Sequence, residues 1–271
     1  MIDGNYAIDY QVHSVRSHDG KASILDQCER AVNIGLDEVG FSEHKDFDPA
    51  DPVVDFFDYE AYMREIEAAR QRYGDSLTIR AGVEIDYQDW FEDRIDDYLK
   101  AHSFDFVIGS VHYVDRHMIM TPEYNQSRTA ETAYGDYFHA VRQSVDSGLF
   151  DIVGHLEYAN RRGIAAWGQY DPGPYREQLD ALFDAMIERG VVFELNTAGL
   201  HQNLGVTYPS STTLSYYTQC GGSLLSIGSD AHHPDQLGHA YGNAARMALA
   251  AGLTKVCTWE NRKPRLVPLR A

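Results

Sequence analysis

The sequence predicts an α/β fold in which parallel strands alternate with helices and close into a barrel. Short apolar runs alternate along the chain with longer stretches whose apolar residues recur at helical spacing. Seven strand–helix units can be counted, and such alternation is typical of βαβ units around a parallel sheet. Seven units favour closure into a barrel over the competing arrangement, an open doubly wound sheet.

The strands are predicted from apolar runs bounded by turns. They are Ala7–Val12, Glu38–Ser42, Thr78–Ile85, Phe104–Ser110, Ile152–Gly154, Val191–Leu195 and Ser223–Ser229. The segment "SILDQCERAVNIG" shows the helical period, since Ile24, Cys28 and Ala31 share one face. Further helices are predicted at Tyr59–Gly74, Trp90–Ala101, Ala130–Ser147, Pro174–Arg189, Thr212–Gln219 and Asn243–Ala250. The final segment, "TKVCTWENRKPRLVPLRA", predicts two short strands around a polar turn.

Glycines mark the joins between helices and the strands that follow them. Segments such as "NIGLDEVGF", "DSGLFDIVGH" and "ERGVVFEL" place a glycine and an apolar residue directly before a predicted strand. Glycine is the residue that most often ends a helix, so these segments support the α-to-β order. No G-x-G-x-x-G follows the first strand, which disfavours a dinucleotide-binding fold.

Length and composition predict a soluble protein of one large α/β domain or two small ones, and we expect a single domain spanning residues 1–271. The net charge of −18 disfavours nucleic-acid partners, because the phosphate backbone is also negative. The three cysteines form no spaced pair, which favours a reducing compartment over a disulfide framework. Neither a leader segment nor a run of about 18 apolar residues is found, so we expect a cytoplasmic protein that does not cross a membrane.

Each predicted strand delivers polar side chains at or near its carboxyl end. The first delivers His13, with His18 and Asp19 just after it; the others deliver Glu43 and His44, Glu84, His112, His155, Glu194 and Asn196, and Asp230 and His232. The carboxyl ends of parallel barrel strands meet on one face, where active sites are built. Imidazole nitrogens and carboxylate oxygens that converge in this way predict a metal site.

The number of candidate ligands is too high for one ion. A catalytic metal takes about three protein ligands, so five histidines and three or more carboxylates predict two or three ions with a bridging carboxylate. The remaining polar groups are expected outside the site. They are His102, His117, His139 and His239 in helical or loop contexts, and a solvated acidic loop with Asp46, Asp48 and Asp51. The sequence leaves open whether His18 or His233 joins the cluster.

The ordered set of segments resembles a known family. The segments are "DYQVHSVRSHDG", "GFSEHKDF", "GVEIDY", "IGSVHYVD", "DIVGHLEY", "ELNTAG" with the later "YPS", "IGSDAHHPDQLG" and "ENRKPRLVPL". They are similar to the polymerase-and-histidinol-phosphatase (PHP) superfamily, and more narrowly to its histidinol-phosphate phosphatases, nearly end to end. The resemblance implies a distorted (β/α)7 barrel of the TIM-like type with up to three divalent ions.

The resemblance also implies a ligand set. The first ion would take Gln11, His13, Glu84 and Asp230; the second would take Glu84 as a bridge with His112 and His155; the third would take Asp19, His44 and His232. Manganese, zinc or iron would be the cofactors.

One ligand position departs from the family pattern. The family begins its first motif with H-x-H, whereas this chain has Gln11-Val12-His13. An amide oxygen is a neutral, weak ligand that suits hard cations better than zinc. We therefore expect a first site that is weakened, shifted to another metal, or served by the Gln11 carbonyl.

A second departure concerns phosphate recognition. Where the phosphatases carry an arginine after the "NTxGL" segment, this chain has His201. Protonated His201, Arg161 or Arg162 would then supply the positive charge that grips a small phosphorylated substrate.

The function that the resemblance implies is metal-dependent hydrolysis of phosphomonoesters, with L-histidinol phosphate in histidine biosynthesis as the first candidate substrate. A metal-bound hydroxide would attack phosphorus, since coordination lowers the pKa of water towards about 7. Asp230 or His232 would then protonate the leaving alkoxide. Two alternatives stay open: a phosphodiesterase acting on small nucleotides or oligonucleotides, and a non-catalytic regulatory domain in which Gln11 records decay of the site.

Overall fold

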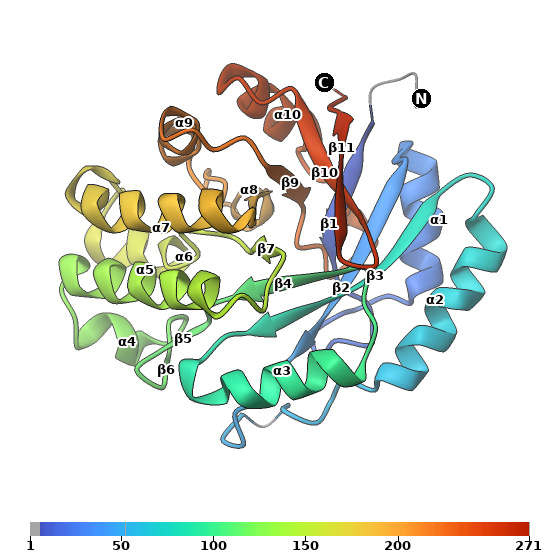
Figure 1. The fold of residues 1–271 in the computed structure, drawn as a ribbon, viewed down its shortest axis with the longest axis horizontal. Coiled ribbons are helices and arrows are strands. Elements are labelled where there is room, and N and C mark those ends of the chain that lie inside the picture. The colour runs from blue at the N-terminus through green and yellow to red at the C-terminus, as the bar shows by residue number, and fades with distance from the viewer. Residues whose placement is uncertain (1–5, 52, 271) are drawn as a thin grey trace.

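Seven parallel strands form the sheet at the centre of the computed structural model, which describes residues 6–51 and 53–270 (Figure 1). In the order in which they neighbour one another, they are β1 (Ile8–Val12), β2 (Glu38–Lys45), β3 (Thr78–Asp86), β4 (Phe106–Ser110), β7 (Ile152–Val153), β8 (Val192–Asn196) and β9 (Leu225–Gly228). All seven predicted strands are therefore present. The largest difference in their bounds is in β2, which continues to Lys45 because Glu43 and His44 stay in register with β3.

The sheet curls until β9 returns to β1. Val12 and Ala231 form a parallel bridge beside the carboxyl end of β1. The backbone N–H of His13 donates to the Ala231 carbonyl at 2.8 Å, and the N–H of Ala231 donates to the Gln11 carbonyl at 3.2 Å. These bonds bring the sheet close to a complete barrel, and the predicted (β/α)7 architecture is confirmed.

The predicted helices surround this sheet (Figure 1). They are α1 (Ile24–Ile34), α2 (Tyr59–Tyr73), α3 (Glu92–Ala101), α5 (Ala130–Ser147), α7 (Arg176–Arg189), α9 (Ser211–Gln219) and α10 (Tyr241–Ala250). A capping box at Ser23 starts α1, and Gly35 ends it in the left-handed conformation with φ of 76°. Gly148 and Gly190 end α5 and α7 in the same way, so the predicted glycine punctuation is confirmed there.

Several short elements lie between the longer ones and are absent from the prediction. They are the hairpin of β5 (Tyr113–Val114) and β6 (His117–Met118), the helices α4 (Pro122–Gln126), α6 (Asn160–Trp167) and α8 (Ala198–His201), and a 3-10 helix at Pro234–Gln236. Most are too short to show a hydrophobic period, which explains why the sequence does not reveal them. The 3-10 helices Asp89–Phe91 and Gly173–Tyr175 overlap the predicted starts of α3 and α7.

The two predicted C-terminal strands are present as an antiparallel hairpin, β10 (Lys255–Glu260) and β11 (Lys263–Pro268). The hairpin packs beside β1, where the backbone N–H of Trp259 donates to the Tyr10 hydroxyl at 2.8 Å. In the described part of the chain, no helix combines the length and the apolar character needed to span a membrane.

The ring of Phe106 holds the first four strands together. It stands 4.8 Å, centroid to centroid, from the Tyr10 ring of β1. It also covers Gly40 of β2 and Gly82 of β3, where an added Cβ would lie 2.8 Å and 2.3 Å from the ring. Positions 40 and 82 therefore require glycine, because any larger residue would collide with the β4 side chain that fills the core between these strands.

We expect Gly82→Ala to destabilise the protein by about 1–3 kcal/mol, because the new methyl group overpacks the Phe106 ring. The matched control is Gly135→Ala in α5, where an added Cβ meets nothing within 4 Å. That control should stabilise the protein by up to about 1 kcal/mol through helix propensity. Urea unfolding measures both, and equal midpoints for Gly82→Ala and the native chain would contradict the packing argument.

Candidate functional site

A cavity of about 400 Å³ opens at the carboxyl ends of the parallel strands. Most of the side chains that line it are ionisable. The lining residues are Asp19, Lys21, His44, Glu84, His112, His155, Tyr158, Arg161, His201, Gln202, Asp230, His232, His233 and Gln236. The cavity therefore lies at the end of the barrel where the strand-end side chains were expected to meet.

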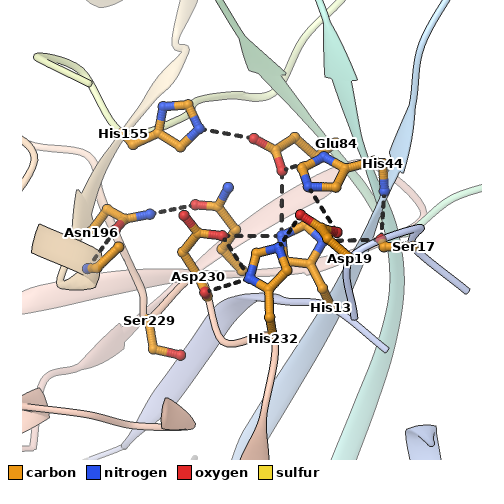
Figure 2. A network of polar contacts seen from close by, with 12 residues as sticks. His13, Ser17, Asp19, His44, Glu84, His155, Asn196, Ser229, Asp230 and His232 are labelled. Carbon is orange, nitrogen blue, oxygen red and sulfur yellow. Dashed lines mark hydrogen bonds and ion pairs between the residues drawn. The ribbon is translucent and has the colours of Figure 1, made fainter. Parts of the chain in front are cut away.

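The carboxylate of Glu84, near the end of β3, is buried and lines this cavity, and Figure 2 shows it among the surrounding imidazoles. Its Oε1 is 3.0 Å from His155 Nε2 and 3.8 Å from His112 Nε2. Its Oε2 is 3.2 Å from His44 Nδ1 and 3.4 Å from His13 Nε2. One carboxylate thus faces four imidazoles that come from four different strand ends.

Two further carboxylates extend the cluster (Figure 2). Asp230 Oδ1 is 3.3 Å from His13 Nε2 and 3.6 Å from His232 Nδ1. Asp19 Oδ2 is 3.1 Å from His232 Nε2, and Asp19 Oδ1 is 3.8 Å from His44 Nε2. The segments after β1 and β9 therefore supply the side of the cluster opposite His112 and His155.

The hydrogen bonds around His13 define which of its ring nitrogens carries a proton. The hydroxyl of Ser17 donates its single hydrogen to Glu43 Oε2 at 2.6 Å, so it must accept from His13 Nδ1–H at 3.2 Å. The Nε2 lone pair of His13 then faces the carboxylates of Glu84 and Asp230, with no hydrogen-bond partner. A lone pair facing two anions is repelled unless a proton or a cation lies between them.

The charges of the cluster shift the pKa values of its members in opposite directions. Burial raises the pKa of Glu84, but the neighbouring His44 and His155 lower it well below its usual range. Burial lowers the pKa of His112 to about 3, so its imidazole is neutral at physiological pH. Burial also opposes protonation of His232, yet Asp19 and Asp230 raise its pKa to about 9.

The donor chemistry fits divalent cations. Two groups of three side chains bring one ligand atom each to within 4.8 Å of one another: His13, His44 and His232 in one, and Glu84, His112 and His155 in the other. His13 Nε2, Glu84 Oε2 and Asp19 Oδ1 are buried without a hydrogen-bond partner. Such unsatisfied nitrogen and oxygen atoms are costly unless they bind a proton or a metal. The described residues therefore contain a His/Glu metal site.

The structure brings together eight of the nine predicted ligands: His13, Asp19, His44, Glu84, His112, His155, Asp230 and His232. Gln11 differs. Its carbonyl oxygen Oε1 accepts a hydrogen bond of 2.6 Å from Asn196 Nδ2, and its amide nitrogen has no partner. The Gln11 carbonyl as a ligand therefore stays a prediction, and one of the two lone pairs of that oxygen already accepts from Asn196.

The three predicted phosphate-binding residues do not all face the cavity. Arg161 lines the cavity, whereas exposed Arg162 is absent from the lining and donates from Nε to the Met120 carbonyl at 3.2 Å. His201 lines the cavity, but burial lowers its pKa and its Nε2 lies 3.1 Å from the Ser229 carbonyl. The structure therefore places His201 but not Arg162 at the cavity, and burial disfavours the protonated form of His201.

Some residues of the site were missed or misplaced by sequence analysis. Exposed Lys21 lines the cavity, and its only sequence signal is its position two residues after Asp19. Asp86 accepts from the backbone N–H of His112 at 2.7 Å and supports that ligand. Asp51, expected in a solvated loop, is instead only 8% exposed and accepts from the Tyr113 hydroxyl at 3.2 Å.

The other predicted strand-end groups form a supporting layer. Glu43 binds Ser17, while Glu194 Oε2 accepts from the backbone N–H of His155 at 2.7 Å. His233 lines the cavity, and His18 lies 3.9 Å from Asp19, but neither belongs to the two ligand groups. The four histidines expected outside the site, His102, His117, His139 and His239, contribute to neither the cavity lining nor a ligand group.

Comparison with known proteins agrees with this geometry. The PHP domain family model matches residues 9–198, which is most of the chain. The chain belongs to the PHP domain family. This membership confirms the resemblance that the ordered motifs indicate.

The similar proteins cover nearly the whole chain. A Deinococcus radiodurans protein named "Probable histidinol-phosphatase" is 27% identical over 94% of this chain and 97% of its own. The histidinol-phosphatase of Lactococcus lactis is 26% identical over 94% of this chain and 95% of its own. A crystal structure of the histidinol phosphate phosphatase from Lactococcus lactis, complexed with zinc, L-histidinol and phosphate, superposes with a TM-score of 0.86 at 25% identity, over 97% of this chain and 100% of that one.

We expect Glu84→Gln to weaken divalent-cation binding by more than the roughly 10–100-fold that is typical for loss of a supporting residue, because Glu84 faces four imidazoles at once. Titration with manganese and elemental analysis measure the effect. Glu260→Gln, at a side chain that is 70% exposed, is the control and should bind metal like the native chain. Undiminished metal content in Glu84→Gln would rule out Glu84 as the bridging ligand.

Proposed function

We propose that this protein is a metal-dependent phosphomonoesterase whose substrate is L-histidinol phosphate, acting in the cytoplasm in histidine biosynthesis. The observation that carries the proposal is the buried Glu84 carboxylate, which faces four imidazoles beneath a cavity that also presents Arg161. Similarity to histidinol-phosphatases over more than nine-tenths of the chain supports the substrate.

We infer that two or three divalent cations, of manganese, zinc or iron, are held by the two ligand groups. Asp19 and Asp230 lie within 4 Å of the imidazoles and are available as additional ligands. When bound, such cations supply positive charge for the phosphoryl oxygens and acidify water. This positive charge also offsets the net charge of −18, which otherwise repels a dianionic substrate.

The chain itself holds the phosphate through Arg161. Its Nη1 donates to the Tyr158 hydroxyl at 2.5 Å, and its guanidinium carbon lies 5.6 Å from the centroid of the Tyr158 ring. Tyr158 in turn stacks on His155 at 4.4 Å between ring centroids. A guanidinium fixed in this way beside a metal ligand is suited to bind a phosphoryl oxygen, and Lys21 on the same cavity adds a second positive charge.

Asp230 and His232, the two predicted proton donors, are better suited to bind cations. Burial raises the pKa of Asp230, but His13 and His232 lower it well below its usual range, so its carboxyl group is ionised. His232 uses Nδ1 to donate to the Asp230 carbonyl at 2.9 Å, which leaves only Nε2 to face the cluster. We therefore assign both residues as ligands and correct their assignment as acids.

The proposal predicts that the native protein, supplied with manganese or zinc, releases phosphate from L-histidinol phosphate. Chelation should abolish the activity, and returning the metal should restore it, since the ligand groups have no other source of positive charge of that strength. A panel of phosphomonoesters with bis(4-nitrophenyl) phosphate as the diester measures selectivity. Faster cleavage of the diester would favour the phosphodiesterase alternative, and a metal-loaded protein inactive on every ester would favour the regulatory one.

Arg161→Gln should lower kcat/KM for L-histidinol phosphate by about 10–100-fold, because it removes a charge-assisted contact to phosphate. Arg162→Gln is the matched control, since Arg162 is the adjacent arginine but does not line the cavity. That variant should stay within about twofold of the native value. Equal losses in the two variants would show that Arg161 has no specific role in phosphate binding.

A further inference from the structure

Gln11 lies in an irregular part of β1 beside the metal site. The register between β1 and β2 shifts between Asp9 and Val12, so one extra residue is inserted there. The Gln11 side chain is fully buried, and it packs where Gly228 of β9 leaves space, since an added Cβ on Gly228 would lie 2.8 Å from Gln11 Cβ. The side chain is therefore enclosed, and its amide direction is set by the groups around it.

A chain of hydrogen bonds fixes which end of the Gln11 amide is the oxygen. The backbone N–H of Ala198 can only donate, and it donates to Asn196 Oδ1 at 2.8 Å. Asn196 must therefore direct its Nδ2 the other way, where it donates to Gln11 Oε1 at 2.6 Å and to Glu194 Oε2 at 3.2 Å. Turning the Gln11 amide over would place two donors against each other.

This orientation is unfavourable for a ligand. The Asn196 N–H occupies one of the two lone pairs of Gln11 Oε1, which is already a neutral and weak ligand atom. The other end of the amide, Nε2, is buried without a partner and can only donate. Gln11 thus has an unpaired donor at Nε2 and an oxygen that is partly engaged by Asn196.

We propose that Gln11 is a positioning residue outside the ligand set, and that this chain binds two divalent cations, one at each of the two ligand groups. The groups are His13 with His44 and His232, and Glu84 with His112 and His155. Gln11 supports the second group indirectly, because Asn196 binds the same Glu194 oxygen that accepts from the backbone N–H of His155. The inference rests on the metal-dependent function proposed above, but it concerns the number of cations that the protein binds and not its rate of catalysis.

The test compares three side chains of similar size at position 11 in the full-length protein, dialysed against manganese chloride and analysed for bound manganese. The native protein and Gln11→Leu should each hold about two equivalents, since neither offers a free oxygen there. Gln11→Glu keeps an acceptor for Asn196 and adds a free carboxylate oxygen, so it should hold about three equivalents or bind manganese at least about tenfold more tightly. Gln202→Leu, at a cavity-lining glutamine whose amide accepts from the Tyr208 hydroxyl, is the control and should resemble the native protein.

The proposal would be overturned if Gln11→Leu bound one equivalent of manganese fewer than the native protein, or if the native protein bound three equivalents. It would also be overturned if Gln11→Glu bound manganese no better than the native chain. If Gln11→Leu does not fold, native crystals soaked in manganese chloride decide the question by anomalous scattering. A manganese ion within about 2–2.6 Å of Gln11 Oε1 would overturn the proposal, and two ions that both lie farther from it would support it. A protein that binds two equivalents but hydrolyses no phosphomonoester would end the proposed function and leave this inference standing.

Discussion

The structure depends on a buried carboxylate whose negative charge the surrounding side chains neutralise only in part. Glu84 is almost inaccessible to solvent, and burial of an isolated carboxylate is costly. Imidazoles surround it, but they do not all bring charge, because burial keeps His112 neutral while Glu84 and Asp19 outweigh burial to raise the pKa of His44. A divalent cation would satisfy the carboxylate and would take the imidazoles as neutral ligands, so the same contacts are consistent with both the burial and a metal site.

The ligands are held by a second layer that comes from the same strand ends. Ser17 and Glu43 orient His13, and Asp86 fixes the backbone of His112. Glu194 fixes the backbone of His155, a residue with a strained φ of 22°. Groups of this kind set the direction and the tautomer of metal ligands, which explains why the carboxyl ends of the strands are rich in polar residues that do not themselves reach the cavity.

The alternation of apolar runs favoured the barrel, and the strand ends predicted that eight of the nine candidate side chains converge, because both follow from period and position along the chain. What failed depended on contacts between distant residues. The direction of the Gln11 amide is set by Asn196, 185 positions away, and no local pattern records it. Arg161 and Arg162 are adjacent and cannot be distinguished by sequence, yet in α6 only Arg161 lines the cavity. Asp51 is buried by Tyr113 from the unpredicted β5 hairpin.

The seam at which the barrel closes has a consequence for how the protein responds to metal. Among the described residues, β1 and the segment that follows β9 are joined by the backbone hydrogen bonds of His13 and Ala231, whereas β3 shares longer ladders with β2 and β4. His13 stands on one side of this seam, and Asp230 and His232 stand on the other. A cation held jointly by these residues would tie the first strand to the last. Metal binding would then stabilise the closed barrel, and amide hydrogens near this seam would exchange with solvent more slowly in the metal-loaded protein than in the metal-free one.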